Sequence, residues 1–302
     1  MDIECSFGEC VVLTPRNYSI VLRLGEVIKE HYAILGMASV SGGYPLYADA
    51  FNEKGLCIAG LNFPVDTVYT PIEKCDMKKR RIAPFELPLF LLSYCASADE
   101  CITLLENIEI ADIDFSEKIK STPLHWHVAD KNGSLVIECF ESRLSVKRNI
   151  ADVLANYPPL DVQIMNLASF QNLTPYRPQN CLSKFMDFSA YGKAFGSFGL
   201  PGDFSSSSRF VKSAYLAALA SNLPEKEITL AHLFTLLYSV AVPKGAVVEG
   251  GSLHVSHHTL YTSCIDMQEL SYNFRTYDSL SVKSVSMLEC DIDGNKTFEI
   301  EI

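Results

Sequence analysis

The sequence predicts a layered α+β protein with sheets inside and helices outside. Short apolar runs, many of them rich in β-branched residues, dominate both ends of the 302-residue chain. Helical segments interrupt these runs twice, so the elements follow the order strands, helices, strands, helices, strands. We find no internal repeat and no linker long enough to separate domains, so residues 1–302 are expected to form a single domain.

The first 63 residues are expected to form strands joined by turns. Residues 11–13 (VVL) are a run that Thr14 and Pro15 end, and residues 32–40 (YAILGMASV) form a second apolar run. The segment FNEKG at residues 51–55 is typical of a hairpin turn that closes with glycine. Residues 56–63 (LCIAGLNF) are therefore expected to be the following strand.

Two helices are predicted next. Residues 85–94 are apolar at nearly every position, which indicates a buried helix. Residues 97–100 (SADE) match a capping box, in which the serine and the glutamate each accept a hydrogen bond from the other residue's backbone. The stripe of Ile102, Leu104 and Leu105 then supplies the inward face of the second helix.

The second half alternates again between strands and helices. LHWHVAD and SLVIECF around the turn at Asn132 and Gly133 predict a hairpin. Further strands are expected at residues 144–149 and 152–156, whereas residues 157–208 are loop-like because they are rich in Pro, Gly, Ser and Asn. Helices are expected at residues 209–221 and, capped by Thr229, at 230–241. The tail from 260 to 302 alternates like strands.

Composition limits the partners and the compartment. The chain has 25 basic and 36 acidic residues, a net charge of −11, which argues against nucleic acid or an anionic membrane as the main partner. The most apolar stretch, residues 84–94, is far shorter than the ~20 residues needed to cross a bilayer. The N-terminus resembles no secretory signal. We therefore expect a cytoplasmic protein whose ten cysteines are reduced and mostly buried.

Three clusters of polar residues have competing interpretations. The histidine-rich segment at residues 254–258 (HVSHH) is expected to be a solvated strand edge or loop rather than a metal site. Trp126 is expected in the core, with His125 and His127 as ordinary neighbours rather than catalytic groups. The basic run at residues 78–81 (KKRR) indicates a solvated loop, or alternatively a mouth that attracts an anionic ligand. No phosphate-binding loop, GxSxG or CxxC occurs, and no cofactor or metal is expected.

Five segments, taken together and in order, resemble the choloylglycine hydrolase family of bile salt hydrolases and penicillin V acylases. They are residues 14–18 (TPRNY), 52–64 (NEKGL with AGLNFP), 123–126 (PLHW), 199–203 (GLPGD) and 208–212 (SRFVK). The resemblance implies a four-layer αββα fold of the N-terminal nucleophile hydrolases. It also implies amide hydrolysis by an N-terminal cysteine, whose α-amine has a pKa near ~7.7–8.0 and serves as the base.

The resemblance assigns catalytic roles to four residues. Asp2 matches the aspartate that holds the N-terminal amine, and Asn62 matches the position whose backbone N–H helps to form the oxyanion hole. Asn156 matches the second asparagine of that hole, and Arg209 matches the arginine near the thiol. Three apolar residues are expected to line the substrate pocket: Met1, Phe63 and Leu124.

The family's nucleophilic cysteine and the arginine beside it have no counterpart in this sequence. In the family both precede the aspartate that Asp2 matches. Cys5 and Cys10 lie after Asp2 and carry no free amine, so they are poor substitutes. The sequence is therefore expected to be an N-terminally truncated form that lacks the first strands and is inactive as it stands, or a chain whose start is placed at an internal methionine.

The leading hypothesis is a bile salt hydrolase that cleaves the amide between a bile acid and glycine or taurine. Asparagine at position 62 resembles the bile salt hydrolases, whereas penicillin acylases typically carry tyrosine there. Two alternatives stay open: a penicillin V acylase or other N-acyl amide hydrolase, and a non-catalytic remnant that binds bile salts or is inactive. The resemblance also implies a homotetramer with residues 170–200 as an assembly arm.

Overall fold

The computed structural model describes residues 1–3, 6–186, 192–249 and 255–302. The chain divides into two compact units. The first combines Met1–Asp152 with Ala241–Ile302, and the second is Val153–Val240. The expectation of a single domain stays a prediction. In the described part of the chain, no helix is both long and apolar enough to cross a membrane.

An eight-stranded sheet is the centre of the first unit. It includes the strands expected at residues 11–13, 32–40 and 56–63. The antiparallel strands follow the order β13-β12-β11-β7-β6-β5-β2-β19. Their bounds are β2 (Glu9–Thr14), β5 (Ile34–Ser41), β6 (Tyr44–Asn52), β7 (Cys57–Asn62), β11 (Leu124–Asp130), β12 (Gly133–Phe140), β13 (Arg143–Arg148) and β19 (Phe298–Ile300).

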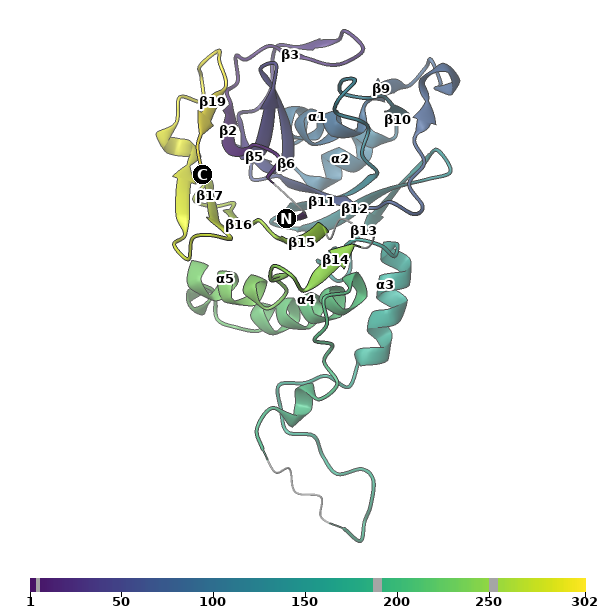
Figure 1. The fold of residues 1–302 in the computed structure, drawn as a ribbon, viewed down its shortest axis with the longest axis vertical. Coiled ribbons are helices and arrows are strands. Elements are labelled where there is room, and N and C mark those ends of the chain that lie inside the picture. Colours follow the sequence, from purple (N-terminus) through teal and green to yellow (C-terminus); the bar gives the residue numbers. More distant parts are fainter. Residues whose placement is uncertain (4–5, 187–191, 250–254) are drawn as a thin grey trace. The chain divides into compact units, whose positions relative to one another are not determined.

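Two helices cover one face of this sheet (Figure 1). They are α1 (Leu87–Tyr94) and α2 (Ala98–Leu105), and α1 is buried over most of its length as predicted. Trp126 packs in the core that the helices share with the sheet, which confirms its expected place. The capping box is only half formed. Ser97 accepts from the Glu100 N–H at 3.3 Å, but the Glu100 carboxylate accepts from the Ala96 N–H at 2.7 Å instead of from Ser97.

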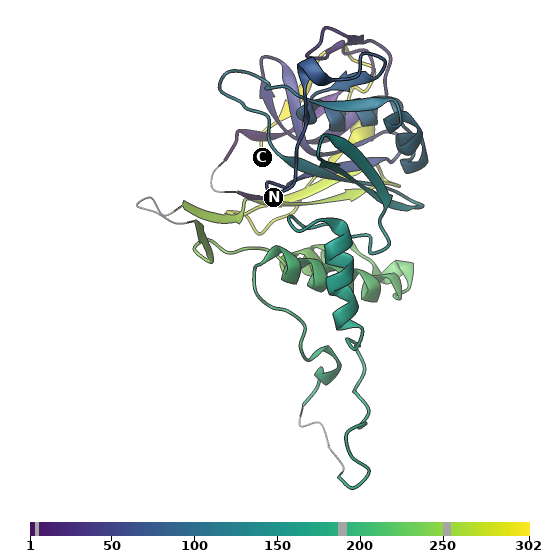
Figure 2. The same ribbon diagram turned by 90° about the vertical axis from the view of Figure 1, so that its right-hand side faces the viewer.

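A second sheet packs on the opposite face, so the tail forms strands as predicted (Figures 1 and 2). It contains β16 (Tyr261–Asp266), β17 (Ser271–Thr276) and β18 (Lys283–Ser286). Side chains alternate across β2: Val12 faces the helices, while Val11 and Leu13 face this second sheet. The eight-stranded sheet is thus covered on both faces within the first unit.

Asp49 of β6 joins the two sheets of the first unit. Its carboxylate accepts hydrogen bonds from the hydroxyls of Tyr261 at 2.5 Å, Tyr272 at 2.6 Å and Ser263 at 3.1 Å. Both tyrosines are buried, and their pKa values are raised by burial and by the Asp49 charge. The phenols therefore stay protonated and act as donors.

Smaller sheets complete the first unit. The strands β1 (Asp2–Ile3), β15 (Val255–Thr259) and β14 (Val247–Glu249) form one sheet with β15 in the middle. The other pairings involve β8 (Thr70–Pro71), β9 (Arg80–Ile82) and β10 (Ile108–Asp112), and β3 (Ile20–Val21) with β4 (Val27–Ile28).

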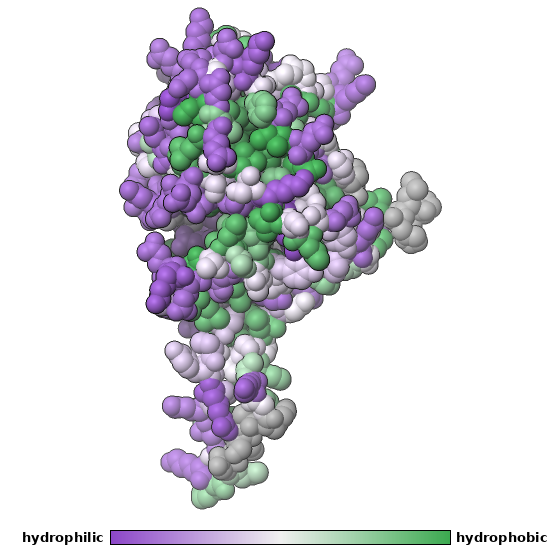
Figure 3. All heavy atoms as spheres, turned by 90° about the vertical axis from the view of Figure 1, so that its left-hand side faces the viewer, coloured by the Kyte–Doolittle hydropathy of each residue, from purple (hydrophilic) through white to green (hydrophobic). Residues whose placement is uncertain are grey.

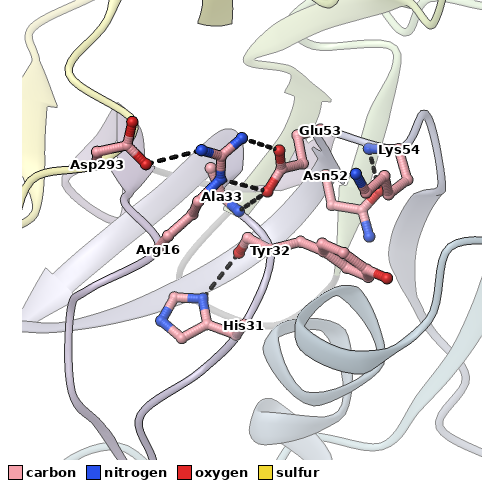
Figure 4. A network of polar contacts seen from close by, with 8 residues as sticks. All are labelled: Arg16, His31, Tyr32, Ala33, Asn52, Glu53, Lys54 and Asp293. Carbon is pink, nitrogen blue, oxygen red and sulfur yellow. Dashed lines mark hydrogen bonds and ion pairs between the residues drawn. The ribbon is translucent and has the colours of Figure 1, made fainter.

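A polar network connects two of the family-like segments in the folded chain (Figure 4). Arg16 of TPRNY donates to the Glu53 carboxylate of the NEKGL turn and to Asp293 near the C-terminus. Glu53 also accepts from the Ala33 N–H at 3.0 Å, and the Arg16 contact holds its pKa below the usual range. The Asn52 side chain closes the turn by accepting from the Lys54 N–H at 3.1 Å. These motif residues stabilise the sheet's turns.

The second unit is helical. It contains α3 (Leu160–Leu167), α4 (Ser206–Ser221) and α5 (Leu230–Tyr238). The two predicted helices are confirmed, with Thr229 capping α5 through the His232 N–H, although α5 ends at Tyr238 rather than at residue 241. Between α3 and α4, residues 171–186 and 192–194 are described as a loop that extends away from the helices of this unit, and apolar and polar side chains are both exposed on it (Figures 2 and 3).

Two expectations for residues 152–208 are wrong. Residues 152–156 form no strand, because Asp152 has a positive φ of 52° and its carboxylate accepts from the Ser134 hydroxyl, so the chain turns at the end of β13. Residues 157–208 are not all loop, because α3 begins directly after Pro159. Leu160 and Gln163 are buried at helical spacing, a pattern hidden by the surrounding prolines and polar residues.

Candidate functional site

The start of the chain lies along β15 in the first unit. The Met1 amine donates to the Tyr261 carbonyl at 2.9 Å, and the Met1 carbonyl accepts from the Leu260 N–H at 2.9 Å. The backbone of Asp2 pairs with Thr259. Residue 2 is therefore held next to the first residues of β16, the strand that carries Tyr261.

Asn62 is the last residue of β7, and its backbone direction follows from the strand register. Asn62 lies opposite Leu124, and the next residue, Phe63, donates its N–H to the Pro123 carbonyl at 2.8 Å. Because bonded and non-bonded pairs alternate in an antiparallel ladder, the Asn62 N–H points away from β11. On that other side, the pairing of β7 with β6 ends at Ala59. The Asn62 N–H therefore lies on the side of β7 that faces away from β11.

The predicted pocket residues differ in exposure. The Met1 side chain is exposed, whereas Leu124 is half-buried and packs against the core beneath α1 and α2. Phe63 is 0% exposed and stacks on the His125 ring, with 4.4 Å between ring centroids and 5° between planes. The role of these residues in substrate contact stays a prediction, and for Phe63 the structure shows contact with the protein interior instead.

Arg209 and Asn156 meet in the second unit. The Arg209 Nη2 donates to Asn156 Oδ1 at 3.0 Å, although 53 residues separate them in the sequence. Arginine has no acceptor, so the amide oxygen must face the guanidinium. The Asn156 Nδ2 group consequently points away from the guanidinium. The structure thus brings together two of the four predicted catalytic residues within one unit.

The GLPGD segment positions Arg209 by starting α4. Ser205 is the N-cap and accepts from the Ser208 N–H at 3.3 Å. Asp203 accepts from the Ser205 N–H at 2.9 Å and from the Ser208 hydroxyl at 2.6 Å, and these bonds lower the Asp203 pKa to about 2. Arg209 follows in the first turn, its N–H bonded to the Ser205 carbonyl at 3.0 Å. The motif is therefore a helix start that carries the arginine.

The histidine-rich segment is not an edge. His254 lies outside the described residues, and β15, which contains His257 and His258, is the middle strand of its sheet with β1 and β14 on either side. His258 is buried and makes an edge contact with the Tyr277 ring. The expected solvated edge or loop is therefore wrong for the described residues, because β1 from the start of the chain and β14, which directly precedes this segment, pair with β15 on either side. In the described ranges, no group of three His, Cys, Asp or Glu side chains is arranged to hold a metal ion.

The basic run divides into two parts. Lys78 and Lys79 are exposed in a turn, as the solvated-loop interpretation predicts. Arg80 instead begins β9, where its guanidinium pairs with Glu26 and lies 4.4 Å from the centre of the Phe90 ring. Arg80 is thus committed to the fold beside α1 and offers little charge to a ligand.

The surroundings of Cys10 do not resemble those of an activated nucleophile. Burial raises the pKa of the Cys10 thiol, and the nearby Glu299 and Glu9 charges raise it further. A thiolate would be favoured by cations, and here anions surround the thiol. Cys5 lies outside the described residues. Cys10 is therefore no substitute for the N-terminal cysteine of the family.

Sequence reasoning missed the importance of His125. Its ring is 0% exposed, and Nδ1 lies 3.6 Å from the Oε1 of Glu138, which is 1% exposed. The pairing of β11 with β12 begins at Trp126 opposite Ile137, and extending this register by one residue places Glu138 opposite His125. The signal was present as LHWHVAD facing SLVIECF, in which a glutamate interrupts an apolar strand at the position opposite a histidine.

His127 on the same face gives a pH-dependent stability. Burial lowers its pKa to about 4 from the ordinary 6.5, with Asp152 opposing the shift and His125 adding to it. Between pH 6.5 and pH 4, His127 is protonated in the unfolded chain but not in the native chain. The unfolding free energy therefore falls as the pH drops through this range. We expect a loss of about 2 kcal/mol in unfolding free energy between pH 7.5 and pH 5 from this residue. Urea unfolding measures it.

The matched variant is His127→Leu. Because it has no imidazole to protonate, its unfolding free energy should fall less over the same pH interval than that of the unsubstituted protein. Equal pH slopes for the two proteins would show that His127 is not the group responsible.

The chain is similar to known proteins over nearly its whole length. Residues 1–299 match the model of the linear amide C-N hydrolases, choloylglycine hydrolase family. A bile salt hydrolase/transferase of Lactiplantibacillus plantarum is 40% identical over 287 residues, which cover 95% of this chain and 87% of the relative. A bile salt hydrolase/transferase of Clostridium perfringens is 34% identical over 302 residues, covering 98% of this chain and 89% of the relative.

Solved structures support the fold. A cysteine-to-alanine mutant of the conjugated bile acid hydrolase from Clostridium perfringens superimposes with a TM-score of 0.91 at 34% identity, covering 100% of this chain and 91% of that one. Penicillin V acylase from Agrobacterium tumefaciens shares the fold, with a TM-score of 0.74 at 20% identity over 100% of this chain and 86% of that one. The expected N-terminal nucleophile hydrolase fold is confirmed.

Proposed function

Because this chain belongs to the choloylglycine hydrolase family of linear amide C–N hydrolases, we propose that it hydrolyses conjugated bile salts. The substrate would be the amide between a bile acid and glycine or taurine, and the products the free bile acid and the free amino acid. Six relatives, between 29% and 40% identical, are bile salt or conjugated bile acid hydrolases by name. The observation that carries the proposal is the bond between Arg209 and Asn156, which brings together two of the residues that the resemblance assigns to catalysis.

The residues of this chain would act on the carbonyl oxygen. In the family, an N-terminal cysteine that precedes the aspartate matched by Asp2 attacks the amide carbon, and negative charge develops on that oxygen. The resemblance assigns donation to this oxygen to the Asn62 backbone N–H and, separately, to Asn156. Arg209 would prevent the Asn156 amide from turning its oxygen towards the anion, and its charge would favour a nearby thiolate. Asp2 would hold the amine that takes the thiol proton.

Position 62 provides a test of substrate choice. We expect Asn62→Tyr to shift the ratio of kcat/KM values for glycocholate and phenoxymethylpenicillin towards the penicillin, because tyrosine stands there in penicillin acylases. Both substrates are compared under identical conditions with protein purified from its own host. The control is the unsubstituted parent protein, assayed in parallel. A higher ratio for penicillin in the parent itself would favour the penicillin V acylase alternative, and an unchanged ratio would remove position 62 from the account.

The assembly is proposed to be a homotetramer that uses residues 170–200 as an arm. The support is a set of large apolar side chains that are exposed on this segment: Tyr176, Leu182, Phe185, Met186 and Phe198. Phe185 is 98% exposed, which is costly in water unless another surface covers the ring. Light scattering should give four times the chain mass, and Leu182→Ser with Phe185→Ser should lower it. A monomeric parent protein would contradict the proposal. The cytoplasmic location stays a prediction that cell fractionation measures.

A further inference from the structure

We infer that a cavity beside α2 is a binding site for a carboxylate that carries an aliphatic body. The cavity has a volume of about 350 Å³ and lies within the first unit, where α2 and β10 contact the β12–β13 end of the eight-stranded sheet (Figure 1). None of the four residues that the resemblance assigns to catalysis is among the described residues that line it. The inference therefore does not depend on the proposed function.

The walls of the cavity are largely apolar and come from several elements. Ile102 and Leu105 belong to α2, Ile108 and Ile110 to β10, and Leu144 and Val146 to β13. A water molecule takes about 30 Å³ in the liquid, so the space would hold roughly ten of them and is too large to be a packing defect. Apolar walls offer this water few hydrogen bonds. An aliphatic chain that displaces it is therefore favoured.

Two cationic side chains, Lys79 and Arg143, lie at the rim of the cavity. Both are exposed, and neither forms an ion pair with another residue in the described part of the chain. Arg80 and Arg148, on neighbouring strands, are by contrast both paired with carboxylates. Two cations left unpaired at one cavity, in a protein with a net charge of −11, favour an anionic group at its rim.

The turn that carries Lys79 is fixed from β10. The Glu109 carboxylate accepts a hydrogen bond from the Asp76 N–H at 2.7 Å. Asp76 in turn accepts from the Lys78 N–H at 2.9 Å through its side chain and from the Lys79 N–H at 3.0 Å through its carbonyl. Glu109 also lines the cavity, but one of its oxygens is used to hold this turn. Lys79 is thus presented to the rim from an ordered backbone.

The turn that precedes Arg143 is fixed as well, although it is strained. Glu141 and Ser142 have φ values of 46° and 64°, in the left-handed region that residues other than glycine rarely adopt. The Ser142 N–H donates to the Val68 carbonyl at 3.0 Å, and its carbonyl accepts from the Thr70 hydroxyl at 3.3 Å. Strain of this kind persists where the surroundings enforce it, and it is common where a ligand is clamped. The turn holds Arg143 at the rim.

The remaining charge at the rim limits the ligand to a single negative charge. Glu106, at the C-terminal end of α2, is exposed and lines the cavity, so it repels an anion. One carboxylate can lie against Lys79 and Arg143, whereas a second negative group would approach Glu106. The volume is at the lower end of the roughly 300–1,000 Å³ of small-molecule sites, which suits a medium-chain fatty carboxylate better than a larger steroid.

The first test is a titration with decanoate, followed by NMR of the protein labelled with ¹³C in the isoleucine δ1 methyl groups. The methyl signals of Ile102, Ile108 and Ile110 should shift and saturate. Octanoate, which is shorter by two CH₂ groups, should bind about tenfold more weakly. Decyltrimethylammonium has the same chain length with the opposite charge and should bind more weakly than decanoate. Shifts confined to other isoleucines, or tighter binding of the cation, would overturn the inference.

The second test removes the two cations. Lys79→Gln with Arg143→Gln changes only exposed side chains, and it should weaken decanoate binding about 3- to 10-fold while leaving the binding of uncharged decanol unaltered. The matched control is Lys78→Gln with Lys131→Gln, which makes the same change in net charge at exposed lysines outside the lining. Equal weakening in both double variants would overturn the inference, because it would show an effect of net charge alone.

Two further variants test the remaining parts of the site. Glu106→Gln should tighten decanoate binding, since it removes the opposing charge, and weaker binding would contradict the placement of the carboxylate. Val146→Trp adds bulk to the cavity from a half-buried position on the edge strand β13 and should abolish the methyl shifts. If it fails to fold, the surface variants above still decide the question. Retained shifts in a folded Val146→Trp protein would overturn the inference.

Cholate identifies the source of the ligand, because it is also a carboxylate with an aliphatic body. We expect it to bind more weakly than decanoate at the same three methyl groups. Tighter binding of cholate there would support the site and assign it to the product of the proposed hydrolysis. All of these titrations measure binding, so a protein that releases no glycine would contradict the proposed function and leave this inference to be decided by the methyl signals.

Discussion

Replacing Asn156 by alanine is expected to lower kcat for glycocholate by about 100- to 1,000-fold, the cost of losing one oxyanion donor. The side chain is presented by Arg209, whose guanidinium holds the amide oxygen at 3.0 Å and so directs Nδ2 away from itself. Because this donor acts on charge that develops during the reaction, KM should change much less than kcat. Steady-state release of glycine measures both constants.

The control for this variant is Asn222→Ala at the far end of α4. Asn222 donates only to the Ala218 carbonyl of its own helix, so the same chemical change there should leave kcat unaltered. Asn156→Asp adds a further comparison, since it keeps the contact with Arg209 but places a negative charge near the oxyanion. It should be at least as damaging as alanine. A higher KM with kcat retained in the Asn156→Ala variant would contradict the assigned role.

Replacing Asp49 by alanine is expected to cost about 3 kcal/mol in unfolding free energy, the largest stability effect in this account. The carboxylate accepts from three hydroxyls of the second sheet, and two of them belong to the buried Tyr261 and Tyr272. Without Asp49 both phenols stay buried with their main acceptor lost. Chemical denaturation at neutral pH measures the difference.

A double-mutant cycle isolates this interaction. With Tyr261→Phe and Tyr272→Phe already in place, Asp49→Ala should cost far less unfolding free energy, because no buried phenol then loses its hydrogen-bond acceptor. Ser263→Ala is the mild comparison, at less than about 1 kcal/mol, since it removes one hydroxyl that sits at 3.1 Å. An equal cost of Asp49→Ala in both backgrounds would show that the hydrogen bonds between the sheets are not its source.

Most of the fold was predictable because its strands and helices have strong local signals. The apolar run at residues 11–13, the NEKG turn and the apolar run of α1 each identify an element without tertiary information. The predictions failed where the signal was mixed or tertiary. The short helix α3 lies among prolines, and residues 152–156 leave the sheet because of a positive φ at Asp152. The central place of β15 depends on β1, which is more than 250 residues away in the sequence, as well as on the preceding strand β14.

The candidate site was only partly predictable, and for a physical reason. The resemblance identified Asn62, Asn156 and Arg209 as site residues. The direction of the Asn62 N–H, however, follows from the strand register, which cannot be read from the sequence. The contact between Arg209 and Asn156 spans 53 residues. The pair of His125 and Glu138 was passed over because a histidine beside a core tryptophan has an ordinary interpretation until its opposite residue on β12 is known.

The most direct test of the central claim is a product analysis of glycocholate after incubation with protein purified from its own host. The account predicts that glycine and cholate appear in equal amounts, and that both disappear from the products when Asn156→Ala is used at the same concentration and time. A thermal shift with glycocholate in the absence of any glycine release would contradict the claim, because it would show a protein that binds bile salts without cleaving them.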